Sequence, residues 1–508
     1  MSTWTRTIAL TVTALWLAGC SSTPSQRQLA QDAVTAMGGA DKLMAIQTLT
    51  MTGGKGTRTK VGQPMTATGP DQVGQLVNDV EILDLANNRA AFDYDLTVGT
   101  FMQHRREVLD REKADAKPIG IESVGGVTFA TTPSGLFSWG TQNSPEWLLR
   151  RNPVSIALAA AESASAANAG EQEEFNGKKM LHGHGKTHDG EDVALYFDPE
   201  TKLLAGFQLL DTETMLGDVT SDYILSDYKD VNGVKLPHHI KIRKGAEDYS
   251  EVQYESIVMN DPKAADVFAV PKEIAAQAAA AATAGDFFPM QLKKVTNGVY
   301  QAQGFRHHSM VVEFPTYVAV VEAPYLETQT HMLAKAIAAQ FPNKPIKYVA
   351  VTHFHYDHIG GIRAAAALGA TILVEKRHEP ALKKLLDAKH THPRDDLETA
   401  RETKKTVGMI ETYDEKKVIK DGNQSLELYA FTGSPHVEPM VMAYVPNGRV
   451  LFQSDLWFPG TGGTGNAEAA QLLDSIKKAN LKVDTMVGGH GLIGPYAELT
   501  KAIAAMKK

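Results

Sequence analysis

Three histidines and an aspartate lie within six residues of one another in the second half of the chain. The run His353–His358 reads His-x-His-x-Asp-His, and imidazole and carboxylate are the usual ligands of zinc in hydrolytic sites. His353 and His355, two positions apart, can point the same way and bind one ion. Asp357 and His358 can face a second ion. A solvated polar loop explains this concentration of ligand types poorly, so the run predicts a metal centre.

The segments on either side would place this run on a loop that leaves a strand. Residues 345–352 are rich in Ile, Tyr and Val and predict a buried strand. Residues 362–368 predict a helix. Gly360 and Gly361, which lie between the run and the helix, allow the backbone to pass close to its neighbours.

The His-x-His-x-Asp-His pattern resembles the signature of the metallo-β-lactamase fold superfamily. The remaining parts of that signature follow in order along the chain. They are Gly433–His436 after a predicted strand at 425–431, Asp455 after one at 450–452, and Val487–Gly491 around His490. The resemblance covers about residues 290–508. It implies an αββα sandwich that holds the ligands on loops at one edge of the paired sheets.

The resemblance also implies two divalent metal ions and a set of ligands for them. Zinc is the metal that we expect, with iron or manganese as alternatives. Three nitrogens would bind the first ion, three further groups would bind the second, and one carboxylate would bridge the two. By this assignment the first set is His353, His355 and His436, the second set is Asp357, His358 and His490, and Asp455 is the bridge.

Two ions in such a site make hydrolysis the natural reaction. Metal binding lowers the pKa of water to about 7, which provides a hydroxide nucleophile at neutral pH. Asp357 would be the catalytic carboxylate that also holds the proton of this nucleophile. The expected function is cleavage of an ester, lactone, thioester or phosphodiester. The alternatives are a β-lactamase-type amide hydrolase, which Asp455 disfavours, and a non-enzymatic lipid- or metal-binding envelope lipoprotein.

The first residues of the chain predict its location. Ile8–Leu17 is an apolar stretch of ten residues, too short to span a bilayer and typical of a signal peptide. Residues 17–20 read Leu-Ala-Gly-Cys and resemble the bacterial lipobox. We therefore expect removal of residues 1–19, lipidation of Cys20, and a polar tether at 20–25. Ser21 resembles a sorting signal, so the expected location is the bacterial envelope, at the outer membrane facing the periplasm.

Composition changes divide the rest of the chain into two expected domains. Residues 26–271 have alternating and turn patterns of an antiparallel β domain, and residues 272–286 form an Ala-rich linker. Three motifs in the first domain resemble lipoprotein-carrier-like (LolA/LolB type) half-barrels: residues 39–43, 196–199 and 235–237. The expected fold class is α+β, with this half-barrel-like domain before the sandwich at 287–508. We expect the sandwich domain to fold and bind metal by itself.

The charge of the chain bears on its partners. The 508 residues carry a formal charge of −8 and contain no run of five or six Lys or Arg residues. This pattern lacks the electrostatic signature of nucleic-acid binding. We expect a small-molecule substrate and a membrane contact through the lipid, whereas the oligomeric state stays open.

Four further histidines and one loop could contribute to the site. His307 and His308, between two predicted strands, either reach the metal edge or belong to a plain turn. His390 and His392 fall in a charged helical insertion and are expected at the surface, with a lid role as the alternative. The glycine-rich loop 458–465 after Asp455 is either a connector or a substrate contact.

Overall fold

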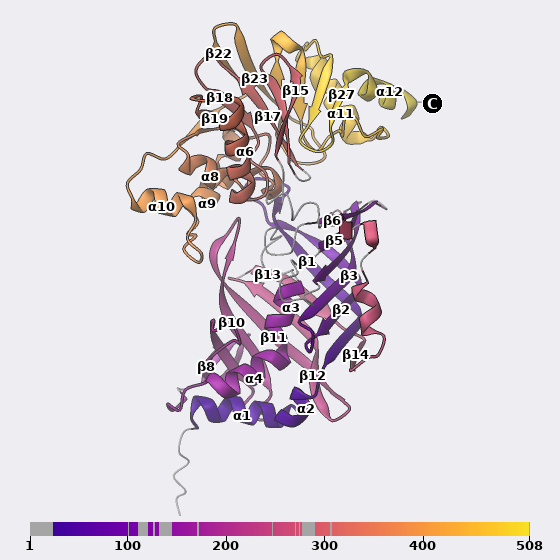
Figure 1. The fold of residues 1–508 in the computed structure, drawn as a ribbon, viewed down its shortest axis with the longest axis vertical. Helices are drawn as coiled ribbons and strands as arrows, with labels where there is room; N and C mark the ends of the chain where they lie inside the picture. Colours follow the sequence, from indigo (N-terminus) through magenta and orange to yellow (C-terminus); the bar gives the residue numbers. More distant parts are fainter. Residues whose placement is uncertain are drawn as a thin grey trace, which may run out of the picture.

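A computed structural model shows two regions of different architecture (Figure 1). It describes residues 24–99, 101–109, 120–124, 127–131, 145–169, 172–245, 247–269, 271–273, 275–276, 290–304 and 307–506. The expected signal peptide, Cys20 and most of the expected linker lie outside these residues. Among the described residues, no helix is both long enough and apolar enough to cross a membrane.

The N-terminal region is built on a large antiparallel sheet. Its strands follow the order β4-β3-β2-β1-β13-β12-β11-β10-β9-β8-β7, and β14 pairs with β1. The strands are β1 (Thr48–Pro64), β2 (Asp71–Asp84), β3 (Arg89–Val98), β4 (Phe101–Leu109), β7 (Glu173–Phe175), β8 (Lys178–Lys186), β9 (Asp192–Phe197), β10 (Leu204–Glu213), β11 (Gly217–Val231), β12 (Val234–Lys244), β13 (Glu247–Gln253) and β14 (Ser256–Met259). A separate pair is formed by β5 (Gly120–Val124) and β6 (Val127–Thr131).

Short helices pack on this sheet. They are α1 (Gln26–Ala36), α2 (Ala40–Met44), α3 (Pro145–Arg151), α4 (Pro153–Ser163) and the 3-10 helix η2 (Ala264–Phe268). Asn152 caps α4 because its side chain accepts a hydrogen bond from the Ser155 N–H, and proline occupies the first helical position. Buried residues of α1, α3 and α4 share one apolar core with the strands.

The C-terminal region contains two mixed sheets. The first has the order β15 (Gln291–Thr296), β16 (Val299–Gln303), β17 (His308–Glu313), β18 (Val318–Val321), β19 (Ile346–Ala350), β20 (Thr371–Glu375) and β21 (Ile410–Tyr413). The second has the order β22 (Lys416–Asp421), β23 (Gln424–Phe431), β24 (Met440–Val445), β25 (Val450–Gln453), β26 (Thr485–Gly488) and β27 (Ile493–Pro495). Strands β18 to β21 are parallel, as are β25 and β26.

Alternating residues of these strands belong to two different apolar clusters. In β18, Ala319 and Val321 join a cluster shared with the second sheet, whereas Val318 and Val320 join a cluster shared with helices. Because side chains alternate along a strand, each sheet has one face against the other sheet.

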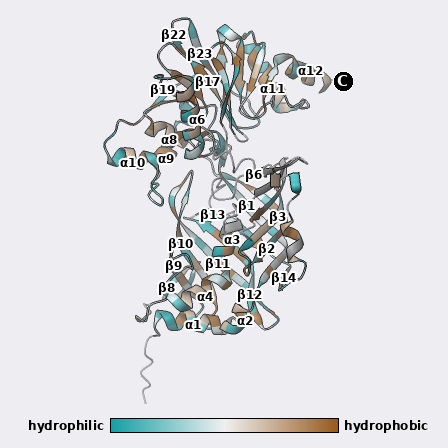
Figure 2. Cartoon of the chain, viewed as in Figure 1, coloured by the Kyte–Doolittle hydropathy of each residue, from teal (hydrophilic) through white to brown (hydrophobic). Residues whose placement is uncertain are grey.

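The helices of this region are α6 (Glu327–Gln340), α7 (Tyr356–Ile359), α8 (Ile362–Ala367), η3 (Lys376–His378), α9 (Glu379–Asp387), α10 (Asp396–Glu402), η4 (Pro446–Gly448), α11 (Ala467–Lys478) and α12 (Tyr496–Met506). Figure 2 shows hydrophobic residues along the strands of both sheets.

The fold is therefore mixed α and β, with a large antiparallel sheet followed by a two-sheet sandwich. The two regions touch where the hairpin between β1 and β2 ends: Gly62 packs against Tyr356, which begins α7. They touch again where Asp218 at the start of β11 accepts hydrogen bonds from Thr391.

Candidate metal centre

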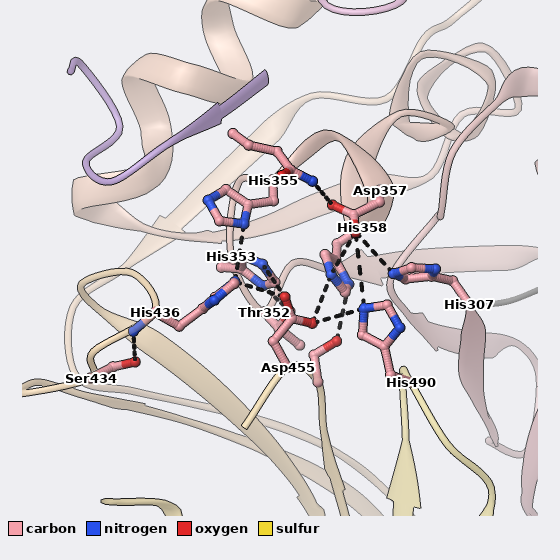
Figure 3. Close-up of polar contacts among 12 residues, drawn as sticks. His307, Thr352, His353, His355, Asp357, His358, Ser434, His436, Asp455 and His490 are labelled. Atoms are coloured by element: carbon pink, nitrogen blue, oxygen red, sulfur yellow. Dashed lines mark hydrogen bonds and ion pairs between the residues drawn. The ribbon is translucent and has the colours of Figure 1, made fainter. Parts of the chain in front are cut away.

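The metal-ligand residues expected from the sequence gather at one edge of the sandwich (Figure 3). The run His353–His358 follows β19 and continues into α7. His436, Asp455 and His490 follow β23, β25 and β26. Each ligand thus stands just beyond a strand whose buried apolar residues fix its position, and the strand ends bring distant parts of the chain together.

One group of four side chains consists of His353, His355, His436 and Asp455. Nδ1 of His355 lies 3.0 Å from Nε2 of His436. Nε2 of His436 also lies 2.7 Å from Oδ2 of Asp455, and Nε2 of His353 lies 3.6 Å from the same oxygen. Three imidazoles and a carboxylate oxygen at these separations are the ligand set of a tetrahedral zinc site.

The second group consists of His307, Asp357, His358 and His490. Oδ2 of Asp357 lies 3.1 Å from Nε2 of His307, 3.7 Å from Nε2 of His358 and 3.9 Å from Nε2 of His490. All of these atoms lie within 4.8 Å of one another. The group contains the three residues expected from the sequence together with His307.

Asp455 lies between the two groups. Its Oδ2 faces His436 and His353, whereas its Oδ1 lies 2.9 Å from Nε2 of His358 and 3.1 Å from Nε2 of His490. A single carboxylate thus presents one oxygen to each group, which is the geometry that a bridging ligand requires.

Several buried atoms that face this centre lack a hydrogen-bond partner among the residues that the structure describes. They are Nε2 of His307, Nε2 of His353, Nε2 of His358 and Oδ1 of Asp455. Each of them lies 2.9 to 3.6 Å from a carboxylate oxygen or an imidazole nitrogen of the centre. Since buried polar groups are nearly always paired, such atoms call for an ion or another ligand. A divalent cation in each group would satisfy them, so the residues fit two ions.

Residues behind the centre orient the ring of His358. Its Nδ1 lies 3.0 Å from Oε2 of Glu322 and 3.0 Å from Oγ of Ser454. Glu322 is fully buried, and its Oε1 accepts a hydrogen bond of 2.5 Å from Thr352. A proton on Nδ1 held by Glu322 leaves Nε2 of His358 free for the centre. Glu322 also has φ of 69°, a left-handed conformation that is uncommon for a non-glycine residue.

Burial sets the protonation of the first group. It lowers the pKa of His355 to about 3, with a further contribution from His436, and lowers the pKa of His353 well below its ordinary value. Both rings are therefore neutral at pH 7, the form that binds metals.

The carboxylates and His358 behave differently. Burial favours the neutral acid, but His358 and other histidines outweigh it and hold the pKa values of Asp357 and Asp455 well below the ordinary range. Burial also opposes the charge of His358, yet Asp455 and Glu322 raise its pKa well above 6.5. A cation that binds between these groups therefore has to displace a proton from His358.

Comparison with known proteins agrees with this geometry. Residues 303–490 match the family model of the Metallo-beta-lactamase superfamily. The C-terminal half contains a metallo-beta-lactamase superfamily domain. No curated protein matches the chain.

Similar solved structures include a metallo-beta-lactamase from Pontibacter korlensis, with 20% identity and a TM-score of 0.32 over 43% of this chain and 99% of that chain. Another metallo-beta-lactamase, from Hirschia baltica, has 18% identity and a TM-score of 0.32 over 42% of this chain and 97% of that chain. The flavodiiron protein from Giardia intestinalis has 17% identity and a TM-score of 0.32 over 43% of this chain and 58% of that chain.

The structure of the metallo-beta-lactamase domain also shows where His307, His308 and His390 lie. His307 is buried beside Asp357, and not part of a plain exposed turn. His308 is buried as the first residue of β17, and its N–H donates to the carbonyl of Gly489. The expectation that His390 lies at the surface is wrong, because only 8% of it is exposed. Burial, together with Arg363, lowers the pKa of His390 to about 4.

His436 and His490 are the more exposed histidines of the centre. The side chains of His436 and His490 are 28% and 22% exposed, in contrast to the fully buried His353 and His358. The ring of Phe458, which is 46% exposed, lies 5.2 Å from that of His490. Phe458 of the glycine-rich loop therefore lies beside one of the ligand residues.

Proposed function

We propose that this protein is a binuclear metal-dependent hydrolase that cleaves an ester, lactone, thioester or phosphodiester bond in a small molecule. The observation that carries the proposal is the position of Asp455, with one oxygen toward each group of ligand side chains. The proposed fold of the domain is the αββα sandwich of its superfamily. The buried atoms without partners and the neutral His353 and His355 rings support metal binding.

In the proposed site, His353, His355 and His436 hold the first ion and Asp357, His358 and His490 hold the second, with Asp455 between them. Zinc is the metal that best suits these nitrogen and oxygen ligands. When bound, the two ions would activate a water molecule and polarise the bond that it attacks.

The residues of the chain would position this water. Asp357 is ionised and faces the centre with Oδ2, so it can accept a hydrogen bond from the water and hold its proton in place. Asp455 adds negative charge that keeps two cations close together. Glu322 and Ser454 hold His358 in place during turnover. The chain supplies no cysteine to the centre, so the attack does not depend on a thiol.

Metal analysis together with a substrate screen tests the proposal. The full chain should contain about two divalent ions and hydrolyse at least one generic ester, lactone, thioester or phosphodiester. A chelator should abolish this activity, and added zinc should restore it. A protein that binds no metal, or that binds two ions and hydrolyses none of these substrates, would contradict the proposal. The second result would favour a non-enzymatic binding role.

We also propose that the protein is anchored in the bacterial envelope through a lipid on Cys20, at the outer membrane facing the periplasm. The lipobox-like sequence supports this, and α1 begins at Gln26, directly after the expected tether. A labelled fatty acid should enter the wild-type protein but not the Cys20→Ser variant. Absence of label from the wild type would refute the anchor.

A further inference from the structure

The hairpin that joins β1 and β2 extends from the N-terminal sheet to the metal centre. Its strands pair without a shift from Gly56 and Leu76 as far as Lys60 and Gln72, and Pro64 then pairs with Asp71 after an irregularity. The intervening residues include Gly62, whose φ of 73° lets the backbone fit between Met215 and Tyr356. A Cβ at this position would lie 2.8 Å from the Cβ of Tyr356, so glycine is required for this close approach.

One contact from this hairpin reaches Asp357. The side-chain amide of Gln63 donates a hydrogen bond of 3.1 Å to Oδ1 of Asp357. Gln63 is only 5% exposed, so water competes little for this bond. Because Oδ1 is engaged by Gln63, the carboxylate directs Oδ2 toward His307 and the rest of the second group.

A second contact reaches His355. Its Nε2 lies 3.0 Å from the carbonyl oxygen of Pro64. A neutral ring that donates from Nε2 carries its lone pair on Nδ1, and Nδ1 is the atom that faces His436 in the first group. Metal-binding histidines commonly donate their other N–H to a backbone carbonyl, which fixes the tautomer and the ring orientation.

The position of Gln63 is itself fixed within the hairpin. Its backbone N–H donates to Oδ1 of Asp71 at 2.9 Å, and its carbonyl accepts a bond of 2.8 Å from the side chain of Gln72. The side chain therefore extends from an ordered backbone, which lowers the entropy cost of holding Asp357.

We propose that the β1–β2 hairpin is a working part of the metal centre, with Gln63 as a positioning residue for the second ion and the Pro64 carbonyl as a positioning group for the first. This inference rests on the proposed two-metal function. It assigns to the N-terminal region a role in metal affinity and not only in anchoring. The sandwich domain, which is expected to bind metal by itself, would then bind it more weakly without the hairpin.

The Gln63→Met variant tests the first contact, because methionine keeps the length of the side chain but removes the donor. Zinc affinity is measured by competition with a chromogenic chelator, and the cobalt-substituted protein gives an absorption spectrum of each site. Loss of an outer partner commonly weakens metal binding by about 10- to 100-fold. We expect a loss of this size for the second ion only, with an unchanged spectrum for the first.

The Thr68→Ala variant is the matched control, since Thr68 is exposed on the same hairpin. It should bind both ions as the wild type does. If Gln63→Met also binds both ions with wild-type affinity and spectrum, the role of Gln63 is refuted. A wild-type protein that binds no metal would refute the proposed function as well, so the two failures are distinguishable.

A shortened hairpin tests the second contact. Lys60 and Gln72 are paired directly, so residues 61–71 can be replaced by Asn-Gly, which forms a two-residue turn. This variant loses both contacts, and we expect weaker binding of the first ion as well as the second, by about 10-fold or more for each. Unchanged affinity for the first ion would refute the role of Pro64. Circular dichroism would verify that the large sheet remains folded.

Discussion

Both regions of the molecule bury charged side chains, but they arrange them differently. In the N-terminal region, Arg151 at the end of α3 lies 2.7 Å from Asp211, and Tyr254 donates a hydrogen bond of 3.1 Å to Asp79. Each of these contacts joins a donor to one carboxylate, although other buried atoms of this region, such as Nε of Arg58 and Nζ of Lys244, have no hydrogen-bond partner among the described residues. In the metal centre, imidazole nitrogens and carboxylate oxygens from several segments instead converge on common points.

The difference shows which feature identifies a functional site. Burial and altered pKa values occur in both regions: the pKa of Glu81 is raised to about 8 by burial and by Asp79, and that of His355 is lowered to about 3. Ion-pair networks that serve only stability also alter pKa values. Convergence of potential ligand atoms is found at the metal centre, and it therefore carries the functional argument.

The largest effect that separates the two regions is expected for Arg151→Met. Removal of one partner of a buried ion pair leaves an uncompensated charge and costs about 3–5 kcal/mol of unfolding free energy. Metal content should stay unchanged, because Arg151 pairs with Asp211 in the N-terminal region and belongs to neither group of ligand residues. Urea unfolding and elemental analysis measure the two quantities.

Arg150→Met is the control for this prediction. Arg150 pairs with Asp189 at 3.1 Å, and both side chains are about 40% exposed. Such surface pairs contribute about 0–1 kcal/mol. Equal destabilisation by the two variants, or loss of metal from Arg151→Met, would remove the distinction between the regions.

The next effect concerns Glu322, a buried carboxylate that acts on the centre through His358. Glu322→Gln keeps the size of the side chain but weakens its hold on Nδ1 of His358, so metal affinity or activity should fall by about 10- to 100-fold. Glu375→Gln, which removes a buried carboxylate paired with Arg377 at the end of β20, should leave metal binding unchanged. Competition with a chelator measures the zinc affinity of both variants. An equal zinc affinity of Glu322→Gln and Glu375→Gln would contradict the role of Glu322.

A further effect is a change in pH dependence. The pKa of Glu81 is about 8 in the folded chain, above its ordinary 4.5, so the folded state binds more protons between these values. The contribution of Glu81 to stability is therefore complete below pH 4.5 and is lost as the pH rises toward 8. Glu81→Gln should raise Tm near pH 8 but not near pH 4.5. A Tm difference that is constant with pH would contradict this sign.

The metal centre has the opposite dependence. The pKa values of Asp357 and Asp455 lie below their ordinary 3.8, so their contribution to stability is present above pH 3.8 and is lost as the pH falls further. Neutral His353 and His355 act in the same direction below pH 6.5, since the unfolded chain binds protons that the folded rings do not. Mild acid should thus destabilise the sandwich through these groups.

The run His353–His358 was expected from its own residue types and from the apolar strand before it, which the structure shows as β19. His436 and Asp455 were expected as ligands from the resemblance to the metallo-β-lactamase fold, and they follow β23 and β25. The strand at 345–352 and the helix at 362–368 were predicted close to their observed ends, Ile346–Ala350 and Ile362–Ala367.

The partners that come from distant segments could not be predicted in this way. Gln63 lies 294 positions from Asp357, and no local pattern distinguishes it from other polar hairpin residues. Glu322 follows the apolar strand β18 directly, a position that offers a weak signal. His390 was misassigned because a charged helical segment suggests exposure, whereas its side chain is buried and lies near Arg363 of α8.

The most direct test of the central claim is the metal content of Asp455→Ala. The account predicts a fall from about two ions per chain toward one, retained by His353, His355 and His436. Turnover should fall by more than about 10- to 100-fold, which is the typical effect of removing a residue that only hydrogen-bonds to a metal ligand. Asp484→Ala, which alters an exposed pair with Arg449, should keep two ions. Two ions and near-normal turnover in Asp455→Ala would contradict the assignment of Asp455 as the bridge.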